Sequence, residues 1–423
     1  MTQDTIEQRT AQGHMSSPTL ATLPLSAIIG AMLARSNQFT DIHVESNMPV
    51  MLRTSAGEWI QAVDSAEAPI MVSHQKILAF VSGIFTGKEE VRPPQAAPWP
   101  WETEFREAGS LHPATVLYTM GDDGTPSTYR VRCTIQRQSM GESIGLVIRA
   151  LHGVPESIMS LGLPLQVNRM ISTSTNGLIV VTGPTGSGKS TSMAAMIEEI
   201  NSSRSNNILT IEDPIEFEFE RKRSIINQRE LYVDVPSFES GVRDALRFVP
   251  DVIMVGEIRD EQTMRAVLRA AESGHLVLTS MHAPTAVAAI RKMLSYLDSG
   301  ADAQALAGCL VGIIAQGLVQ AISGQKKETE RANCLAYEVL NCKDQSVITA
   351  ITSSARGQGD QLAKIEERLR SNDIEGSTPM AQSLRSLISR GLVDARKAAV
   401  LAYHPADRSE FMRAANPPPV APR

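Results

Sequence analysis

The chain has 423 residues, 42% of them hydrophobic and 20% charged, and a formal net charge of −6. The length predicts two to three domains, the composition is that of a globular protein, and the small acidic charge argues against a general basic face for nucleic acid. The four cysteines form no C-x-x-C pair and have no histidine at ligand spacing, so they indicate reduced, buried or incidental thiols in a cytosolic protein and no zinc site.

The first third of the chain predicts an α+β domain over residues 23–152. Residues 1–22 lack the apolar core of a secretory signal and are predicted to be a disordered leader. Apolar residues then recur at helical spacing, and alternating patterns predict strands over residues 129–135 and 144–148, with arginines on one face.

A proline-rich stretch, residues 92–101, interrupts this domain inside an insertion of about residues 86–128. Because proline neither continues a helix nor pairs in the interior of a sheet, the stretch predicts a surface loop. Its tryptophans, Trp99 and Trp101, could dock a partner, but packing against their own domain is the commoner arrangement.

A second domain is predicted after a connection at residues 153–166, which is marked by glycines and prolines. Over residues 167–284, short apolar runs alternate with helical patterns, as in a parallel sheet that helices cover on both faces. The runs are residues 178–181, 208–211, 252–255 and 276–278.

Residues 285–408 predict a mostly helical region. Its most membrane-like stretch, residues 306–322, is interrupted by Gln316 and Gln320 and falls short of the ~20 apolar residues of a membrane span. It therefore predicts a buried helix. Residues 409–423 end in a proline-rich run and predict a tail.

A phosphate-binding motif, G-x-x-x-x-G-K-[ST], follows the first apolar run. Its glycines let successive backbone N–H groups point at phosphates, and the N-terminus of the next helix favours the same anion. Lys189 would reach the β- and γ-phosphates of ATP, and Ser190 would hold Mg²⁺. The residues predicted to bind the nucleotide are Gly183, Pro184, Thr185, Gly186, Ser187, Gly188, Lys189, Ser190 and Thr191.

Carboxylates follow the next two apolar runs, at the strand ends where open α/β sheets bind their ligands. Glu212, Asp213 and Glu216 follow the second run. Glu257 follows the third run after a glycine, which is typical of a Walker B element. Carboxylates at adjacent strand ends suit phosphoryl transfer, which needs a positioned metal and an oriented water.

Two histidines, His275 and His282, flank the fourth run. Single histidines are usually satisfied core residues, but two beside one strand could sense the γ-phosphate or link the site to a neighbour.

These elements, in this order, resemble those of the type II/IV secretion ATPase superfamily (GspE/PilT-like), which powers type II secretion, type IV pili and related transfer systems. In this resemblance residues 183–191 are the Walker A motif, 211–217 the aspartate box, 250–260 the Walker B motif and 274–282 the histidine box. Glu216 falls on the glutamate that activates water, Glu257 on the Walker B carboxylate, and His275 and His282 on the histidine-box pair.

Upstream, residues 40–43 (TDIH) resemble the opening of the family's N-terminal PAS-like domain. Arg132 and Arg149 fall on its arginine-bearing strands, which implies that they are arginine fingers. Such arginines stabilise transition-state charge at the γ-phosphate. The alternative is that they are ordinary exposed strand charges.

The resemblance covers about residues 23–402 and lies nearest the retraction-like branch. The chain lacks the four-cysteine insert of assembly-type members, and residues 382–393 partly resemble the closing helical motif of retraction-type members. That branch includes the DotB ATPases of type IVB Dot/Icm secretion and the TraJ ATPases of conjugative transfer. The proline-rich insertion and the incomplete closing motif favour this group over a true pilus retraction motor.

The resemblance implies an α/β fold class: an N-terminal PAS-like α+β domain, then a RecA-like P-loop ATPase domain with a helical C-terminal region. It implies a cytoplasmic homo-hexamer, peripheral at the inner membrane, that uses ATP and Mg²⁺ to drive membrane-embedded secretion or pilus base proteins by domain rotation, without direct contact with nucleic acid. The expected role is type IVB secretion or conjugative transfer. The alternatives are type IV pilus retraction, a nucleic-acid translocase, and a weakly hydrolysing regulatory ATP-binding module.

Overall fold

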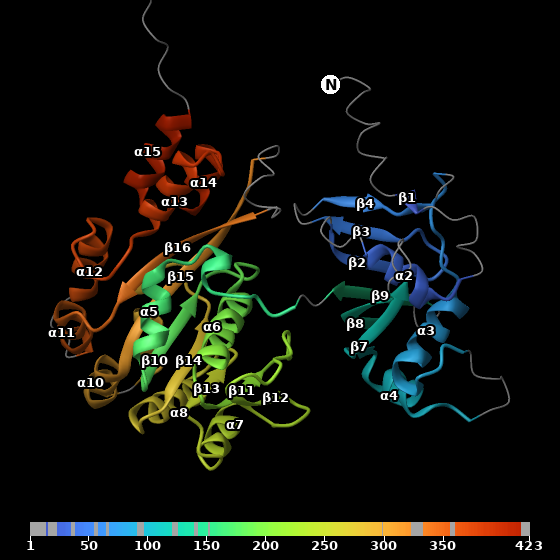
Figure 1. The fold of residues 1–423 in the computed structure, drawn as a ribbon, viewed down its shortest axis with the longest axis horizontal. Helices are drawn as coiled ribbons and strands as arrows, with labels where there is room; N and C mark the ends of the chain where they lie inside the picture. The colour runs from blue at the N-terminus through green and yellow to red at the C-terminus, as the bar shows by residue number, and fades with distance from the viewer. Residues whose placement is uncertain are drawn as a thin grey trace, which may run out of the picture. The chain divides into compact units, whose positions relative to one another are not determined.

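The computed structural model divides the chain into two compact units, residues 1–152 and 153–423 (Figure 1). It describes residues 14–15, 23–34, 39–54, 58–64, 67–90, 97–120, 126–138, 143–150, 153–297, 299–322, 333–355 and 360–415.

The first unit is built on an antiparallel sheet with the strand order β4-β3-β2-β9-β8-β6, and β7 also pairs with β8. Three helices share its core, since Ile28 of α2, Ile77 of α3 and Phe105 of α4 belong to the same buried cluster as Ile148 of β9. The strands are β2 (Phe39–Glu45), β3 (Met51–Thr54), β4 (Trp59–Gln61), β6 (Ser110–Leu111), β7 (Ala114–Met120), β8 (Pro126–Gln138) and β9 (Ser143–Ala150), and the helices are α2 (Leu25–Leu33), α3 (His74–Thr86) and α4 (Pro100–Ala108).

Two short strands, β1 (His14–Met15) and β5 (Val63–Asp64), pair in parallel in the same unit. The prediction of a disordered leader is thus wrong for His14 and Met15. The other residues of the leader, 1–13 and 16–22, lie outside the described residues.

The prediction of a surface loop at residues 92–101 is wrong at its end, because helix α4 begins at Pro100. Proline fits the first turn of a helix, where its missing N–H has no intrahelical partner to lose. Trp101 is buried and its ring stacks on that of Phe85 with the centroids 5.8 Å apart. Trp101 therefore packs against its own unit; residues 91–96 lie outside the described residues.

The second unit is built on a seven-stranded sheet with the order β12-β11-β13-β14-β10-β15-β16, in which only the edge strand β16 runs antiparallel. Its strands are β10 (Gly177–Thr182), β11 (Asn207–Glu212), β12 (Ile225–Glu230), β13 (Val252–Val255), β14 (Leu276–Met281), β15 (Leu310–Gln320) and β16 (Asn333–Asn341). Since the six other strands are parallel, the loops that follow them meet at one edge of the sheet.

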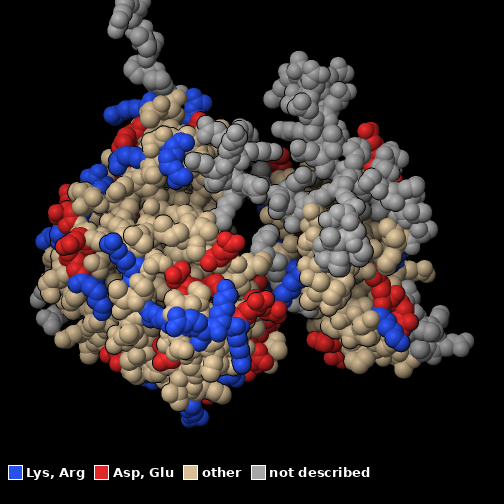
Figure 2. All heavy atoms as spheres, viewed as in Figure 1, with Lys and Arg blue, Asp and Glu red and all other residues tan. Residues whose placement is uncertain are grey.

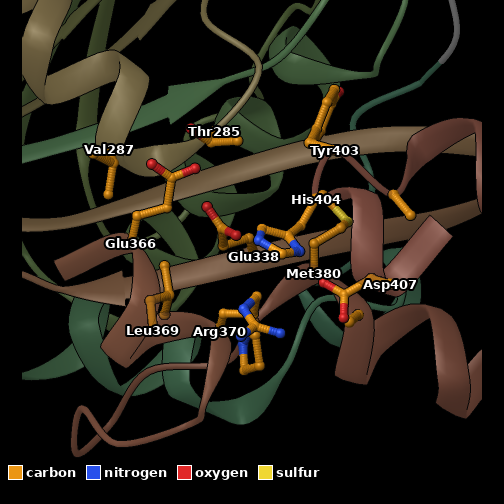
Figure 3. A pocket seen from close by; sticks show the side chains of 13 residues that line it. Thr285, Val287, Glu338, Glu366, Leu369, Arg370, Met380, Tyr403, His404 and Asp407 are labelled. Atoms are coloured by element: carbon orange, nitrogen blue, oxygen red, sulfur yellow. The ribbon is translucent and has the colours of Figure 1, made fainter. Parts of the chain in front are cut away.

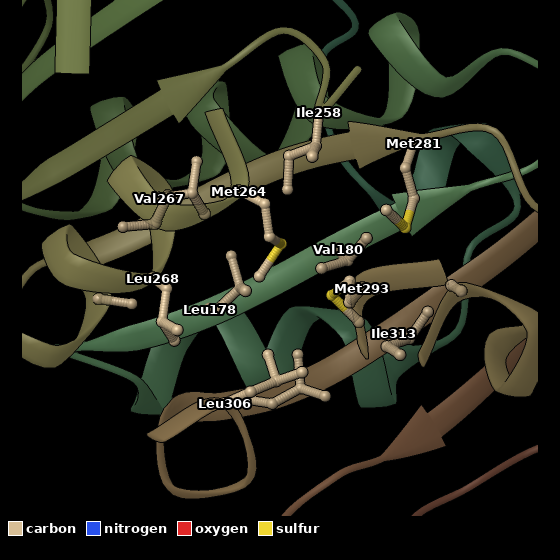
Figure 4. Packing of buried hydrophobic residues seen from close by; sticks show 14 of the residues in the cluster. Leu178, Val180, Ile258, Met264, Val267, Leu268, Met281, Met293, Leu306 and Ile313 are labelled. Atoms are coloured by element: carbon tan, nitrogen blue, oxygen red, sulfur yellow. The ribbon is translucent and has the colours of Figure 1, made fainter. Parts of the chain in front are cut away.

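Helices cover both faces of this sheet. Leu178 and Val180 of β10 face a core that includes α7, α8, α9, α10, α11 and α12, while Ile179 and Val181 face a core that includes α5 and α6. Figure 4 shows the first core, where Met264 and Leu306 lie beside β10. Alternate residues of one strand thus serve opposite layers, which explains its continuously apolar sequence. The helices that cover the two faces are α5 (Leu165–Thr173), α6 (Lys189–Ser203), α7 (Phe238–Ala245), α8 (Glu261–Glu272), α9 (Ala286–Ser295), α10 (Gly300–Cys309), α11 (Gln345–Ala355) and α12 (Gln361–Arg370). A 3-10 turn lies at Met159–Leu161.

The prediction of a buried helix over residues 306–322 is wrong. Helix α10 ends at Cys309, and the following residues form β15, which lies between β10 and β16. A short apolar run does not distinguish a buried helix from a buried strand by its periodicity. Both faces of β15 are covered, which favours the continuous run of Val, Ile and Leu that it carries.

Three further helices share a buried cluster with the end of β15 and the start of β16. They are α13 (Met380–Ser389), α14 (Ala395–Leu401) and α15 (Pro405–Ala415). Helix α15 extends into the segment predicted to be a tail from residue 409; residues 416–423 lie outside the described residues. Across the described ranges, no helix has both the length and the apolar character needed to cross a bilayer.

All four cysteines are buried free thiols, as predicted. The fold class is also confirmed: a strand-rich α+β unit precedes an α/β sheet unit with a helical C-terminal region.

Candidate active site

The predicted phosphate-binding loop joins β10 to α6 at the edge where the parallel strands end. Gly188 caps α6 with φ of +85°, a left-handed conformation that favours glycine. A Cβ added at Gly183 would lie 2.3 Å from the carbonyl oxygen of Gln316, so this position has no room for a side chain. The loop's glycines are thus required both by its own turn and by the neighbouring strand β15.

Lys189, the first residue of α6, is 9% exposed and turns back over the loop. Its Nζ donates to the carbonyl oxygens of Gly183 at 3.0 Å and Pro184 at 3.1 Å. Burial lowers the pKa of Lys189 below its ordinary value, while the charges of Glu257 and Glu216 act in the opposite direction. The structure therefore brings three of the predicted residues into one electrostatic environment.

His282, which follows β14, connects Lys189 to Glu257. Its Nδ1 lies 3.4 Å from Lys189 Nζ, and its Nε2 lies 3.4 Å from Glu257 Oε2. Because an ammonium group can only donate, Nδ1 is the acceptor and Nε2 carries the proton that faces the carboxylate. Glu257 is further held by Arg259, whose Nε lies 3.0 Å from Glu257 Oε1 and whose Nη1 lies 2.8 Å from Asp213 Oδ2.

Hydrogen bonds hold the segment that carries His282 against β10. Thr182 Oγ1 accepts from the N–H of Ala283, and its single proton lies between the carbonyl oxygens of Ala283 at 2.8 Å and Met281 at 3.1 Å. The last residue of β10 thereby fixes the chain on both sides of the histidine, next to the start of the phosphate-binding loop.

Glu212 and Glu216 lie at the end of β11 and in the loop that follows it. Burial raises the pKa of Glu212, although hydrogen bonds from Thr210 Oγ1 at 2.6 Å and Gln228 Nε2 at 3.1 Å lower it. Glu212 is thus a buried, internally bonded carboxyl. Glu216 is only half-buried and interacts electrostatically with both Lys189 and Glu212, so it is the more accessible of the two for chemistry.

Ser190 and Thr191 lie in the first turn of α6 and are both half-buried. Beside them, the buried hydroxyl of Ser187 has no hydrogen-bond partner. An unsatisfied buried hydroxyl in a loop of inward-facing donors is typical of a site whose ligand supplies the missing partner.

His275 does not join this group. The prediction that both histidines lie at one site is therefore wrong within a single chain. It precedes β14, whereas His282 follows it, so the six residues of the strand separate them, roughly 20 Å at ~3.3 Å per residue. Its Nδ1 lies 3.0 Å from both Ser273 Oγ and the carbonyl oxygen of Ala270 at the opposite edge of the sheet. His275 therefore cannot reach a ligand at the P-loop of its own chain.

Arg132 and Arg149 lie in the first unit, directly opposite each other on β8 and β9. Arg149 Nε donates to Asp41 Oδ1 at 2.7 Å, yet the arginine side chain is 61% exposed. Burial would raise the pKa of Asp41, but hydrogen bonds from Arg149 and Thr40 outweigh it and the pKa is lowered. The two guanidinium groups share one face of the sheet, as predicted from the alternation of the strands.

Sequence reasoning missed Gln316 and Arg259. Gln316 lies on β15, is 1% exposed, and donates from Nε2 to the carbonyl oxygen of Ser187 at 2.7 Å. Its signal in the sequence is an amide inside an apolar run, one of the two that interrupt residues 306–322. For Arg259, the only signal in the sequence is its position two residues after Glu257.

Comparison with known proteins identifies the family of this chain. The family model described as type II/IV secretion system protein matches residues 127–398. The type IV pilus retraction ATPase PilT of Pseudomonas aeruginosa is 30% identical over 362 residues, which cover 85% of this chain and 93% of that protein. A twitching motility protein of Neisseria gonorrhoeae is 35% identical over 271 residues, 63% of this chain and 68% of that protein.

Solved structures show the same fold. The pilus retraction motor PilT with bound ADP superposes with a TM-score of 0.71 at 31% identity, covering 91% of this chain and 98% of that one. The ATPase DotB of Legionella pneumophila superposes with a TM-score of 0.70 at 24% identity, covering 92% and 98%. The family match, the identity with PilT over most of both chains and the fold therefore establish that this chain belongs to the type II/IV secretion system protein family, in its retraction-like branch, and is a nucleotide-binding ATPase.

Proposed function

We propose that this ATPase hydrolyses ATP with Mg²⁺ at the carboxyl edge of β10, β13 and β14, and that hydrolysis drives a membrane-embedded machine. The observation that supports this most directly is the contact chain from Lys189 Nζ through His282 to Glu257, with 3.4 Å at each step. It joins the P-loop cation and the Walker B carboxylate, which come from distant parts of the sequence.

The donor set fits a nucleotide and its metal. Lys189 Nζ bonds directly only to the neutral carbonyl oxygens of Gly183 and Pro184 in a buried position, and anionic phosphates would supply charged acceptors in their place. Ser190 and Glu257 would hold Mg²⁺, partly through water. The metal would supply charge neutralisation at the phosphates.

Glu216 is proposed to orient the attacking water, because it is half-buried and interacts electrostatically with Lys189. Arg132 and Arg149 are proposed as arginine fingers that act on the γ-phosphate when domains close. The exposed position of Arg149 and its register opposite Arg132 support this role.

The assembly is proposed to be a homo-hexameric ring in the cytoplasm, peripherally associated with the inner membrane through secretion or pilus base proteins. Nucleotide-dependent rotation of the domains would transmit the motion to that base.

For the machine itself we propose type IVB secretion or conjugative transfer. Type IV pilus retraction is the second candidate, and the 30% identity with PilT over 85% of this chain favours it. Isolation of the protein with its native membrane partners separates the two. Secretion-channel proteins would support the first candidate, and pilus-retraction components alone would refute it in favour of the second.

The catalytic proposal is tested by the ATPase rates and nucleotide affinities of the full chain and three variants. Glu216→Gln should lower kcat about 100-fold or more while the protein still binds nucleotide, as expected on loss of a water-positioning group. Lys189→Ala should lose nucleotide binding, and Glu218→Gln, an exposed neighbour in the same loop, should behave like the wild type. Equal, negligible rates in all four proteins would refute hydrolysis at this site.

A further inference from the structure

Gln316 lies beside the start of the phosphate-binding loop because of the register of β15. Ala315 is the partner of Thr182, the last residue of β10, so Gln316 is level with the first residue of the loop. On its other side it pairs with Tyr337 of β16. The backbone of Gln316 is therefore fixed in the interior of the sheet, and its carbonyl oxygen closes the space at Gly183.

The side chain of Gln316 reaches further along the loop, to the peptide that joins Ser187 and Gly188. Its Nε2 donates to the Ser187 carbonyl oxygen at 2.7 Å and lies 3.4 Å from where a Cβ at Gly188 would be. The carbonyl and the following N–H of a trans peptide point in opposite directions. A Ser187 carbonyl that is held toward β15 therefore turns the N–H of Gly188 away from β15.

This one bond carries the side-chain contact, since the other side-chain polar atoms of Gln316 and Ser187 lack partners. Gln316 Oε1 and Ser187 Oγ are both buried and unsatisfied. A buried amide with one unpaired atom costs free energy of folding, so its presence at this position calls for an explanation, which the bond to the Ser187 carbonyl supplies.

We propose that Gln316 is a positioning residue for nucleotide binding: its amide fixes the Ser187–Gly188 peptide so that the N–H of Gly188 faces the phosphates before the nucleotide arrives. This inference rests on the proposed nucleotide site at residues 183–191. A preformed donor loses less conformational freedom on binding, so the effect falls on affinity more than on the rate of the bound complex.

The test compares Gln316→Met, which keeps the length of the side chain and removes the N–H donor, with Gln320→Met as a matched control. Gln320 lies on the same strand and the same face, is exposed, and accepts from Lys397 Nζ instead of contacting the loop. Measured on the full chain are the Kd for MgADP by calorimetry, KM and kcat for ATP, and the melting temperature without nucleotide.

Gln316→Met should raise Kd and KM about tenfold, which corresponds to about 1.4 kcal/mol, with kcat changed less than about twofold. Gln320→Met should change none of the three. If Gln316→Met binds MgADP like the wild type, or if it only lowers the melting temperature, the inference is wrong. If it does not fold, Gln316→Leu, which also lacks the N–H donor and adds no charge near the phosphates, replaces it.

Lys189→Ala separates failure of this inference from failure of the site. Unchanged MgADP binding by Lys189→Ala would refute the proposed nucleotide site itself. Loss of binding by Lys189→Ala together with normal binding by Gln316→Met would refute only the role of Gln316.

Discussion

Glu338 on β16 is a buried carboxyl between the N-termini of two helices, and we predict that it makes the stability of the second unit depend on pH. Its Oε1 accepts from the N–H of Ala286, at the start of α9, at 2.9 Å, and the N–H of Met380, at the start of α13, also bonds to it. Figure 3 shows Glu338 beside His404 and Met380, in a cavity of about 50 Å³.

Burial raises the pKa of Glu338 from 4.5 to about 7, although the two backbone hydrogen bonds lower it. Since the folded state holds the proton more tightly than the unfolded state, the stabilisation is fully present below the unfolded pKa and is lost as the pH rises through the folded pKa. At 1.36 kcal/mol per pKa unit the loss between about pH 4.5 and pH 8 is on the order of 3 kcal/mol. This is an upper limit, because part of the residue surface is exposed.

Glu338→Gln keeps one acceptor oxygen for the helix N-termini and cannot ionise. We therefore expect the variant and the wild type to be similarly stable at pH 5, and the variant to be the more stable at pH 8. The assay is thermal unfolding of the full chain in steps from pH 5 to pH 8. A difference of 3 kcal/mol would move the melting temperature of the second unit by roughly 6–12 °C.

The matched control is Glu367→Gln, because Glu367 is an exposed carboxylate on the same helix α12 and is not among the residues that line the cavity. A stability difference between Glu338→Gln and the wild type that stays constant from pH 5 to pH 8 would refute the reasoning. The same pH-dependent difference in Glu367→Gln would assign the effect to surface charge instead of to Glu338.

Two further predictions concern the first unit. Asp41→Asn should destabilise it by about 1–2 kcal/mol at neutral pH, because a bond between charged groups is lost, and the difference from the wild type should vanish as the pH falls through the lowered pKa of Asp41. Thermal unfolding at several pH values checks this, with the exposed Glu58→Gln as control. A stability difference that persists in acid would contradict it. Trp101→Ala should cost about 3–5 kcal/mol, as for other buried aromatic residues, and a melting temperature equal to that of the wild type would show that Trp101 does not anchor α4.

The places of the glycine-rich loop at residues 183–191 and of the carboxylates after β11 and β13 could be predicted because their signals are local. A glycine-rich turn between an apolar strand and a helix has the same conformation wherever it occurs, and parallel strands bring their carboxyl ends to one edge. Lys189, Glu257 and His282 accordingly meet where their positions after β10, β13 and β14 predict.

Two other features could not be predicted because they depend on partners distant in the chain. Residues 310–320 are apolar enough for a buried helix, and only the space between β10 and β16 makes them a strand. His275 and His282 are close in sequence, but the extended strand β14 separates them by its whole length. Their shared place in one sequence motif does not show this distance.

The glycine-rich loop, the parallel strands β10, β11, β13 and β14, and the polar residues that follow them could be read from the chain, because these follow from backbone conformation and from apolar periodicity over a few residues. The bond of Gln316 to the Ser187 carbonyl and that of Arg149 to Asp41 appear only in the folded protein. The physical reason is that each of these contacts joins residues more than 100 positions apart, and their geometry is set by the register between strands, for which a single sequence contains no local signal.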